Sequence, residues 1–271
     1  MTFFVRERYL VNSLIDLAIE AACTAGEAIL KYRYKSNLVT YKQDNSPLTL
    51  ADQHANSLIN EYLARSNILV VSEESEDLHL DASCYWLVDP LDGTKDFLVG
   101  NDEFTVNISL INDRKPVLGV VFAPAIDNLC WGARGIGAWC KSDKKIMALK
   151  SRPSVNVLRM ATSHFHNHLD IKLFAKENNV ISRVAIGSAF KFSLLAMSEV
   201  DVYPRLVGSS EWDTAAGQAL LESVGGQVLN WHTGQPLQYG KANRRNPKLF
   251  SIRSPYGWED FKLKTYETEL L

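Results

Sequence analysis

The chain has 271 residues, 46% of them hydrophobic and 22% charged, and its 29 Lys and Arg against 31 Asp and Glu give a formal net charge of −2. This is the composition of a globular protein, and it excludes a disordered chain, a collagen and a coiled coil. A charge so close to zero also argues against a general binder of nucleic acid or of membrane surfaces, because both rely on a basic field.

The first half of the chain is predicted to form two helices followed by a β-meander. Apolar residues recur at helical spacing over residues 10–32, and a second helix is expected from Thr49 to about Arg65. Apolar runs then predict strands at residues 68–72, 85–89, 104–111 and 117–122, followed by a hairpin over residues 131–139.

The second half is predicted to alternate strands and helices. Residues 141–156 are rich in Lys, Ser, Arg and Pro, which marks an expected boundary. Beyond it, strands are expected near residues 157–162, 181–186 and 227–230, and helices near residues 167–178, 189–198 and 213–224. The sequence therefore predicts two subdomains, residues 1–150 and residues 151–271.

The cysteines and the N-terminus bear on the compartment. Cys23, Cys84, Cys130 and Cys140 include no C-x-x-C pair, which fits reduced thiols better than a disulfide framework. Charged residues stand where a signal peptide would be apolar, and no apolar run approaches the roughly 20 residues that span a bilayer. We expect a cytoplasmic protein without a transmembrane segment, and peripheral association with an inner membrane stays open.

The motif Asp89-Pro-Leu-Asp-Gly-Thr94 ends an apolar strand and carries the clearest chemistry. Two carboxylates three residues apart in a tight turn can converge on one hard cation, and Mg²⁺ takes such oxygen ligands. The Leu91 carbonyl between them can add another oxygen, while the N–H groups of Gly93 and Thr94 suit phosphate if a helix begins there. Taken alone, the hexapeptide leaves a metal site and an ordinary solvent-facing turn both open.

A second acidic run, residues 72–77, follows the strand at 68–72 directly. Taken alone it reads as a solvated acidic loop. If its strand neighbours the strand that ends at Asp89, Glu73 lies beside Asp89 and a two-metal site becomes possible.

Two further acids are open to a purely structural interpretation. Asp213 opens a predicted helix, where an acidic residue favours the helix dipole. Asp52 lies in Thr49-x-x-Asp52, which resembles a capping box.

Four motifs together carry a resemblance: Thr49-Leu-Ala-Asp52, Ser72-Glu-Glu-Ser75, Asp89-Pro-Leu-Asp-Gly-Thr94 and Trp212-Asp-Thr-Ala-Ala-Gly217. In this order and spacing, the chain resembles the inositol monophosphatase superfamily from the first helix to about residue 240. Within it, the chain is most similar to the bacterial CysQ-type 3'(2'),5'-bisphosphate nucleotidases, at Asp44-Asn-Ser-Pro-Leu-Thr49, Asp92-Gly-Thr-Lys-Asp-Phe97, Glu103-Phe-Thr-Val-Asn107 and Tyr203-Pro-Arg205.

The resemblance implies an α/β (α+β) fold, a layered αβαβα sandwich of the inositol monophosphatase and fructose-1,6-bisphosphatase type, with metals between its two halves. Carried over by motif, Glu73, Asp89 and the Leu91 carbonyl bind one Mg²⁺, and Asp89, Asp92 and Asp213 bind another. A third Mg²⁺ stays open. Residues 1–150 would then carry most metal ligands, and residues 151–271 would carry Asp213 and the substrate side.

The resemblance also implies catalytic roles. Glu73 and Thr94 would orient and activate a water molecule at the metals, and Asp52 would hold the Thr94 hydroxyl. Asp213 would lie on the opposite side, near the leaving oxygen. A cation that neutralises phosphate and lowers the pKa of water makes a covalent nucleophile unnecessary.

The substrate is expected to be a bisphosphate, whose second phosphate needs cationic partners. Lys95, Lys191 and Arg205 are the candidates, although Lys191 could equally be a solvated lysine. Ser163-His164 resembles a nucleotidase segment, although His164 could also be an ordinary surface histidine. The expected substrate-binding residues are Glu73, Leu91, Asp92, Gly93, Thr94, Lys95, Ser163, His164, Ser188, Lys191, Arg205 and Asp213. Residues 241–245 are interpreted as a solvated basic loop.

The expected function is that of a Mg²⁺-dependent phosphomonoesterase that removes the 3'-phosphate of adenosine 3',5'-bisphosphate, is inhibited by lithium and serves sulfur metabolism. An inositol monophosphatase or another sugar-phosphate phosphatase with the same metal site is the alternative, and a non-catalytic relative has no support because no motif carboxylate is missing. A haloacid-dehalogenase mechanism fails because its nucleophile would fall on Pro90, and a calcium loop fails because its last ligand would fall on Gly100. The partner is a small phosphate ester and no nucleic acid, and the chain is expected to be a monomer or a homodimer.

Overall fold

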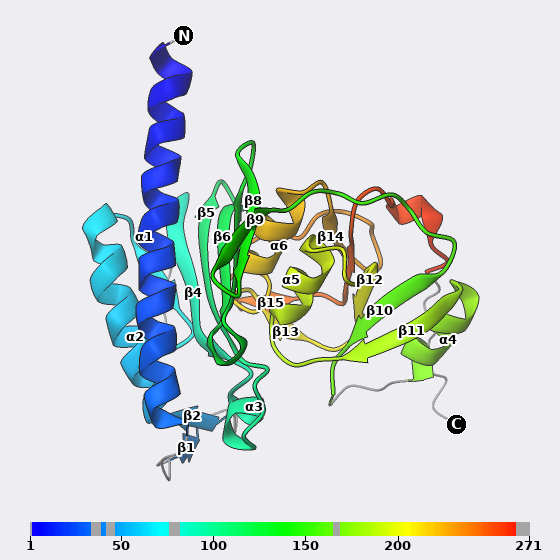
Figure 1. Ribbon diagram of the computed structural model, residues 1–271, viewed down its shortest axis with the longest axis horizontal. Coiled ribbons are helices and arrows are strands. Elements are labelled where there is room, and N and C mark those ends of the chain that lie inside the picture. The colour runs from blue at the N-terminus through cyan, green and yellow to red at the C-terminus, as the bar shows by residue number, and fades with distance from the viewer. Residues whose placement is uncertain (1, 34–38, 42–46, 76–81, 165–168, 264–271) are drawn as a thin grey trace.

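The computed structural model describes residues 2–33, 39–41, 47–75, 82–164 and 169–263. Figure 1 shows layers in the order helix pair, large sheet, helix pair, small sheet and single helix. This arrangement is a layered mixed α/β fold, as predicted. The division into residues 1–150 and 151–271 stays a prediction.

The outer helix pair covers one face of the large sheet. Helices α1 (Thr2–Tyr32) and α2 (Leu50–Leu63) pack against each other and against the strands. A row of buried alanines in α1, which includes Ala18, Ala21 and Ala25, allows this close packing. The first helix begins earlier than expected, and the second ends in a 3₁₀ turn, η1 (Ala64–Ser66).

The large sheet has seven strands in the order β3-β4-β5-β6-β7-β8-β9. Strand β3 pairs parallel with β4, and the following strands form the predicted antiparallel meander. The strands are β3 (Val70–Ser72), β4 (Cys84–Asp92), β5 (Thr105–Asn112), β6 (Lys115–Ala123), β7 (Asn128–Ala133), β8 (Gly137–Ser142) and β9 (Lys145–Ala148). Strand β9 falls within the expected boundary at residues 141–156, because its four residues are exposed and their sequence shows no alternation of buried and exposed positions.

Helices α5 (Phe190–Ala196) and α6 (Ala215–Glu222) lie between the two sheets. Helix α6 contacts β5, β6 and β7 on one side and β14 on the other. It approaches β6 so closely that a Cβ on Gly119 would lie 2.1 Å from the Ala216 carbonyl oxygen. Only glycine fits there, and the close approach holds α6, whose N-terminus follows Asp213, against the large sheet.

The small sheet has the order β11-β10-β12-β16-β14. It is mixed, because β16 enters antiparallel between β12 and β14. Its strands are β10 (Leu158–Thr162), β11 (Val180–Ala185), β12 (Val202–Arg205), β14 (Gln227–Asn230) and β16 (Leu249–Ile252). Helix α4 (Leu169–Glu177) covers its outer face through Phe174. Strands β12 and β16 were not predicted, since Pro204 interrupts one pattern and the other is only four residues long.

Short elements complete the fold around the acidic motifs and at the edges. They are β1 (Val39–Tyr41), β2 (Pro47–Thr49), α3 (Thr94–Leu98), η2 (Pro124–Ile126), β13 (Ser209–Ser210), β15 (Arg245–Asn246) and η3 (Trp258–Asp260). All four cysteines are free thiols. In the described part of the chain, none of the helices is long and apolar enough to cross a membrane.

Candidate active site

The metal turn, residues 89–94, lies where β4 ends beside β5. Strand β4 continues through Pro90, and an irregularity in its pairing places Asp89 opposite Asn107 but Asp92 opposite Thr105. Asp89 is buried, and its Oδ1 accepts a hydrogen bond from the backbone N–H of Leu91 at 3.1 Å. The turn therefore has a fixed shape rather than that of a solvated loop.

A helix does begin after the turn, as predicted, because α3 starts at Thr94. Gly93 precedes it with φ +88°, which is left-handed backbone. A Cβ there would also lie 3.1 Å from the carbonyl oxygen of Glu103. Glycine is thus required twice, by its conformation and by its neighbour.

Glu73 lies beside the metal turn, as the sequence predicted. Strands β3 and β4 pair in parallel with Ser72 opposite Val88, and the Glu73 N–H donates to the Val88 carbonyl at 3.0 Å. Because β3 and β4 are neighbouring parallel strands, Glu73 and Asp89 lie at the same end of the sheet. Both side chains line one cavity of about 960 Å³.

Asp213 reaches this cavity from the other half of the chain, just before α6. Its Oδ2 accepts a hydrogen bond from Ser210 N at 3.1 Å and faces an Arg205 guanidinium nitrogen at 3.2 Å. Arg205 thus has a carboxylate partner on the site itself. If Arg205 binds a second phosphate as predicted, its guanidinium would have to contact that phosphate and Asp213 together.

The electrostatics of the turn call for a cation. Burial, followed by the charges of Glu73, Asp92, Asp213 and Asp52, raises the pKa of Asp89 well above its usual range. Burial, followed by the Asp213 charge, raises the pKa of Asp92 to about 6, although neighbouring cations oppose the shift. The donor set consists of oxygens, which is what Mg²⁺ binds, so the residues present fit the predicted cofactor.

The predicted catalytic pair also comes together. Thr94 Oγ1 lies 3.3 Å from Asp52 Oδ1 and 3.1 Å from the Leu91 carbonyl oxygen. Asp52 uses its other oxygen to accept hydrogen bonds from Thr49 N at 2.8 Å and Thr49 Oγ1 at 2.5 Å. The capping box and the contact with Thr94 are therefore both present, and the two interpretations of Asp52 are compatible.

Of the three predicted cations, Lys191 is the most informative. It is 3% exposed, so its interpretation as a solvated lysine is wrong. Its Nζ donates to the Ile186 carbonyl at 2.9 Å, and burial, opposed by the Asp92 charge, lowers its pKa to about 8. Lys95 is exposed in the first turn of α3 and lines the cavity together with Lys191 and Arg205.

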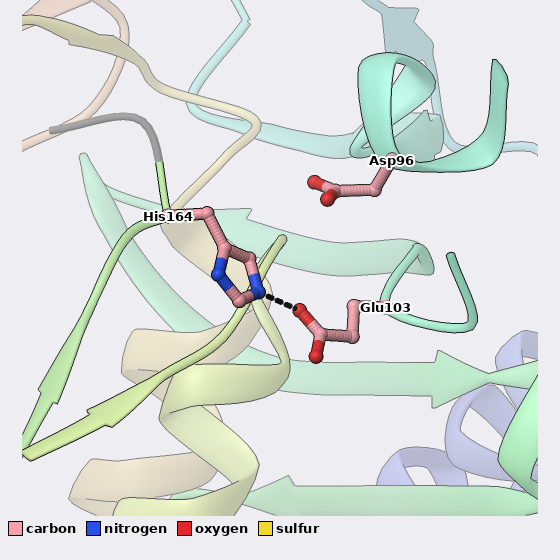
Figure 2. Close-up of side chains that lie close together, drawn as sticks. All are labelled: Asp96, Glu103 and His164. Carbon is pink, nitrogen blue, oxygen red and sulfur yellow. Dashed lines mark hydrogen bonds and ion pairs between the residues drawn. The ribbon is translucent and has the colours of Figure 1, made fainter. Parts of the chain in front are cut away.

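The predicted nucleotide-side residues lie at the cavity or next to it. Ser163 and Ser188 line it, and Ser188 has a left-handed backbone with φ +48°. His164 is not free on the surface, because its Nε2 contacts Glu103 Oε2 at 2.5 Å (Figure 2). Of the resembling motif at residues 44–49, residues 44–46 lie outside the described residues.

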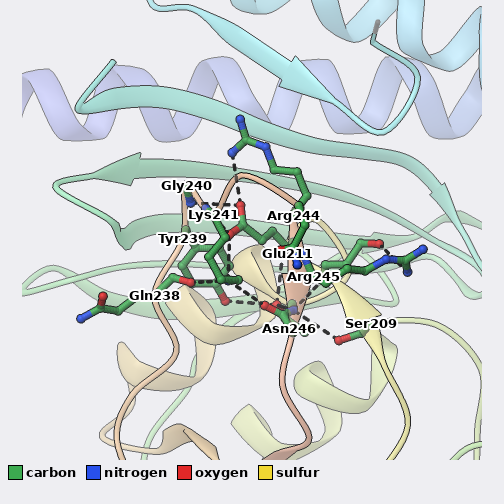
Figure 3. Close-up of polar contacts among 12 residues, drawn as sticks. Ser209, Glu211, Gln238, Tyr239, Gly240, Lys241, Arg244, Arg245 and Asn246 are labelled. Carbon is green, nitrogen blue, oxygen red and sulfur yellow. Dashed lines mark hydrogen bonds and ion pairs between the residues drawn. The ribbon is translucent and has the colours of Figure 1, made fainter. Parts of the chain in front are cut away.

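Sequence reasoning missed Glu211, which is fully buried. Its carboxylate accepts hydrogen bonds from the backbone N–H groups of Gly240 and Lys241 and pairs with Lys241 Nζ at 2.8 Å and Arg244 at 3.3 Å (Figure 3). Residues 242–245 line the cavity. The interpretation of residues 241–245 as a solvated basic loop is therefore wrong for Lys241 and Arg244, which pair with Glu211, while the other three residues of the stretch are exposed. The available signal was an unassigned Glu two residues before Asp213.

Comparison with known proteins agrees with this geometry. Residues 10–249 match the Inositol monophosphatase family. The 3'(2'),5'-bisphosphate nucleotidase CysQ of Escherichia coli (strain K12) is 38% identical over 236 residues, which cover 83% of this chain and 94% of that protein. CysQ of Buchnera aphidicola subsp. Acyrthosiphon pisum (strain APS) is 36% identical over 255 residues, 90% of this chain and 94% of that one.

A solved structure matches the fold as well. The crystal structure of CysQ from Bacteroides thetaiotaomicron, described as a bacterial member of the inositol monophosphatase family, superposes with a TM-score of 0.80 at 32% identity. The match covers 90% of this chain and 98% of that one.

Proposed function

This chain belongs to the inositol monophosphatase family and is a phosphatase, and we propose that it removes the 3'-phosphate of adenosine 3',5'-bisphosphate to give AMP and phosphate. The relatives named as 3'(2'),5'-bisphosphate nucleotidases, at 36–38% identity over most of the chain, support this substrate. The cavity also supports this substrate, because both carboxylates and the side chains of Lys and Arg residues line it. The carboxylates suit metals at the reacting phosphate, and the cations suit a second one.

The single observation that carries the proposal is the buried Lys191. Burying a lysine is costly unless an anion offsets its charge. Asp92 offsets it in part, and a phosphate that enters the same cavity would complete the offset. An inositol monophosphate has no second phosphate to use this charge, so Lys191 favours a bisphosphate.

The metals in this proposal are two Mg²⁺ ions, or three. Glu73, Asp89, Asp92, Asp213 and the Leu91 carbonyl would hold them. When bound, Mg²⁺ would neutralise phosphate oxygens and lower the pKa of a water molecule.

The chain's own residues would orient the reaction. The Thr94 hydroxyl, held by Asp52, would align the attacking water together with Glu73. The N–H groups at the start of α3, beside Gly93, would donate to phosphate oxygens. Asp213, on the opposite side, would lie by the leaving oxygen, with the Arg205 guanidinium 3.2 Å from its carboxylate. The four free thiols support a site of action in the cytoplasm.

The test is phosphate release from adenosine 3',5'-bisphosphate, inositol 1-phosphate and fructose 1,6-bisphosphate, with and without Mg²⁺. We expect the highest kcat/KM for the adenosine substrate and no turnover without a divalent cation. A preference for inositol 1-phosphate would overturn the proposed substrate and leave the metal site intact.

A further inference from the structure

One carboxylate oxygen joins the two halves of the chain at the edge of the active site. Glu103, just before β5, accepts hydrogen bonds on Oε2 from the Gly187 backbone N–H at 2.7 Å and from His164 Nε2 at 2.5 Å. Gly187 follows β11 and His164 follows β10, so both donors come from the small-sheet half. Figure 2 shows the His164 ring directed at this carboxylate.

The backbone of Glu103 is packed as tightly as its side chain. A Cβ on Gly187 would lie 2.7 Å from the Glu103 carbonyl oxygen and 2.6 Å from Asp96 Oδ2. A Cβ on Gly93 would lie 3.1 Å from the same carbonyl oxygen. Glu103 is therefore wedged between the metal turn, at Gly93, and the segment of residues 186–191, at Gly187.

We call this segment, residues 186–191, the substrate loop. It leads from β11 into α5 and to the buried Lys191. Lys191 Nζ donates back to the Ile186 carbonyl at 2.9 Å, and the Ala189 N–H donates to Asp92 Oδ2 at 2.5 Å. Ser188 between them is held in a left-handed conformation, which costs free energy unless its surroundings impose it. The Gly187 N–H contact with Glu103 fixes the entry to this loop.

Asp96, Glu103 and His164 are also residue types that transition metals bind, and their ligand atoms lie within 4.8 Å of one another. However, the Glu103 oxygen that contacts His164 already accepts two hydrogen bonds, and Asp96 Oδ1 accepts one from Asn101 at 3.0 Å. Ligation would have to break contacts that already satisfy these atoms. The cluster is better suited to order the loop than to hold an ion.

We propose that Glu103 is a positioning residue: its carboxylate ties the substrate loop and His164 to the metal-turn half, and so sets where Lys191 stands relative to Asp92. The proposal rests on the proposed function, in which Lys191 serves the second phosphate. It requires a hydrogen-bond acceptor at Glu103 rather than a charge.

The first test measures the loop without any substrate. Hydrogen exchange followed by mass spectrometry is compared for wild type, Glu103→Ala, Glu103→Gln and the control Asp102→Asn. Asp102 is the neighbouring acid, and it pairs with Arg33 instead. We expect exchange in peptides over 183–191 to become about tenfold faster in Glu103→Ala, because the loss of one ordinary hydrogen bond makes local opening easier by about that factor. Exchange should change less than twofold in Glu103→Gln, which keeps an acceptor oxygen, and in Asp102→Asn. Unchanged exchange in Glu103→Ala would overturn the proposal.

The second test asks whether Glu103 acts through Lys191. In kinetics with adenosine 3',5'-bisphosphate, Glu103→Ala should raise KM about tenfold with kcat within threefold, and Glu103→Gln should restore KM to within threefold of wild type. In a Lys191→Ala background, Glu103→Ala should add less than a further twofold. The proposal would be overturned if Glu103→Ala raised KM by the same factor in the Lys191→Ala background as in wild type. It would also be overturned if Glu103→Gln were as impaired as Glu103→Ala.

The two proposals can fail separately. If the wild type does not hydrolyse the bisphosphate, the proposed function is wrong, and the exchange experiment still tests the role of Glu103. Conversely, normal exchange in Glu103→Ala fails the positioning role while the substrate preference of the wild type stands.

Discussion

The hydroxyl of Thr94 lies 3.3 Å from Asp52 Oδ1, although 42 residues separate them in sequence. Asp52 stands in the first turn of α2 and is held there by Thr49, while Thr94 opens α3 at the metal turn. Two helix N-termini thus meet at one hydrogen bond. Because the cap already fixes Asp52, the Thr94 hydroxyl is oriented before any substrate arrives.

The first prediction concerns this pair. Thr94→Val keeps the size of the side chain but removes its hydroxyl, and we expect kcat to fall at least about 100-fold, the lower range for loss of acid–base assistance. Thr94→Ser keeps the hydroxyl and should stay within about fivefold of wild type. The measurement is kcat under saturating substrate and Mg²⁺, and a Thr94→Val variant as active as Thr94→Ser would contradict the assigned role.

The metal turn shows what a sequence can predict about such a site. Asp89 and Glu73 each follow an apolar run, and acids at the ends of neighbouring strands must lie close together. Local patterns therefore suffice for the position of the turn at residues 89–94, the capping box of Asp52 and the meander of the large sheet, whereas the metal assignment depends on the family resemblance. These features depend on residues near in sequence or on adjacent strands.

The substrate side could not be predicted in the same way. Lys191 reads as an ordinary helix lysine, because only the packing of α5 between two sheets makes it buried. Glu211 is buried because a distant loop supplies Lys241 and Arg244 as partners. Contacts between segments dozens of residues apart leave no periodic signal, and the same holds for Glu103 and Gly187.

The second prediction concerns Asp89. Asp89→Asn removes one charge from a buried set of carboxylates and keeps an oxygen that can accept from the Leu91 N–H. Turnover should fall more than about 1,000-fold, the scale of a lost charge stabilisation at the reacting phosphate, because this side chain would help to hold both metals. The metal-free variant should nevertheless melt at a higher temperature than metal-free wild type at pH 7, because it no longer buries a carboxylate beside Glu73 and Asp92.

Thermal melts with and without Mg²⁺ provide the check. Mg²⁺ should raise the melting temperature of wild type, because a ligand that binds the folded state stabilises that state. It should have a clearly smaller effect on Asp89→Asn, which would bind the ion more weakly. Near-normal turnover at saturating Mg²⁺ would refute the two-metal assignment.

A third prediction follows from the family resemblance: lithium inhibits the enzyme. A small cation that occupies one of the Mg²⁺ positions would hold product phosphate in place. Phosphate release is measured over a range of lithium concentrations at fixed Mg²⁺. Full activity at lithium well above the Mg²⁺ concentration would count against the assignment.

The fourth prediction concerns stability away from the site. Asp201 is fully buried and accepts from Arg253 Nε at 2.6 Å, Arg159 Nε at 3.1 Å and Arg159 N at 2.8 Å. Asp201→Ala leaves Arg159 and Arg253 without this buried carboxylate and should lower the free energy of unfolding by about 3–5 kcal/mol. Glu199→Gln, an exposed acid 4.0 Å from Arg152, should change it by less than about 0.5 kcal/mol.

The same carboxylate gives a pH dependence with a definite sign. Burial by itself would raise the pKa of Asp201, but hydrogen bonds from Arg159 and Arg253 outweigh burial and lower it. Its contribution is therefore present above the unfolded pKa of about 3.9 and is lost as the pH falls through the folded value. Denaturant unfolding from pH 7 to pH 3 should show the difference between wild type and Asp201→Asn shrinking only below about pH 4. A difference that shrinks between pH 7 and pH 5 would contradict this assignment.

The last prediction separates substrates through Lys191. If its ammonium holds the second phosphate, Lys191→Ala should lower kcat/KM for adenosine 3',5'-bisphosphate about tenfold to a hundredfold, mainly through KM, because a hydrogen bond between charged groups is worth roughly 1.5–3 kcal/mol. Inositol 1-phosphate should lose less than threefold. Lys172→Ala, which removes an exposed lysine of α4, is the matched control and should leave both substrates unaffected.

The pH profile sharpens this test, since burial lowers the pKa of Lys191 to about 8. A lysine with a lowered pKa is charged below that value and loses its proton as the pH rises through it. In wild type, kcat/KM for the bisphosphate should therefore decline above about pH 8, since kcat/KM reports groups of the free enzyme. Lys191→Ala should lack that decline, and inositol 1-phosphate should not show it with either protein. An equal loss on both substrates would instead mean that Lys191 supports the fold or the reacting phosphate.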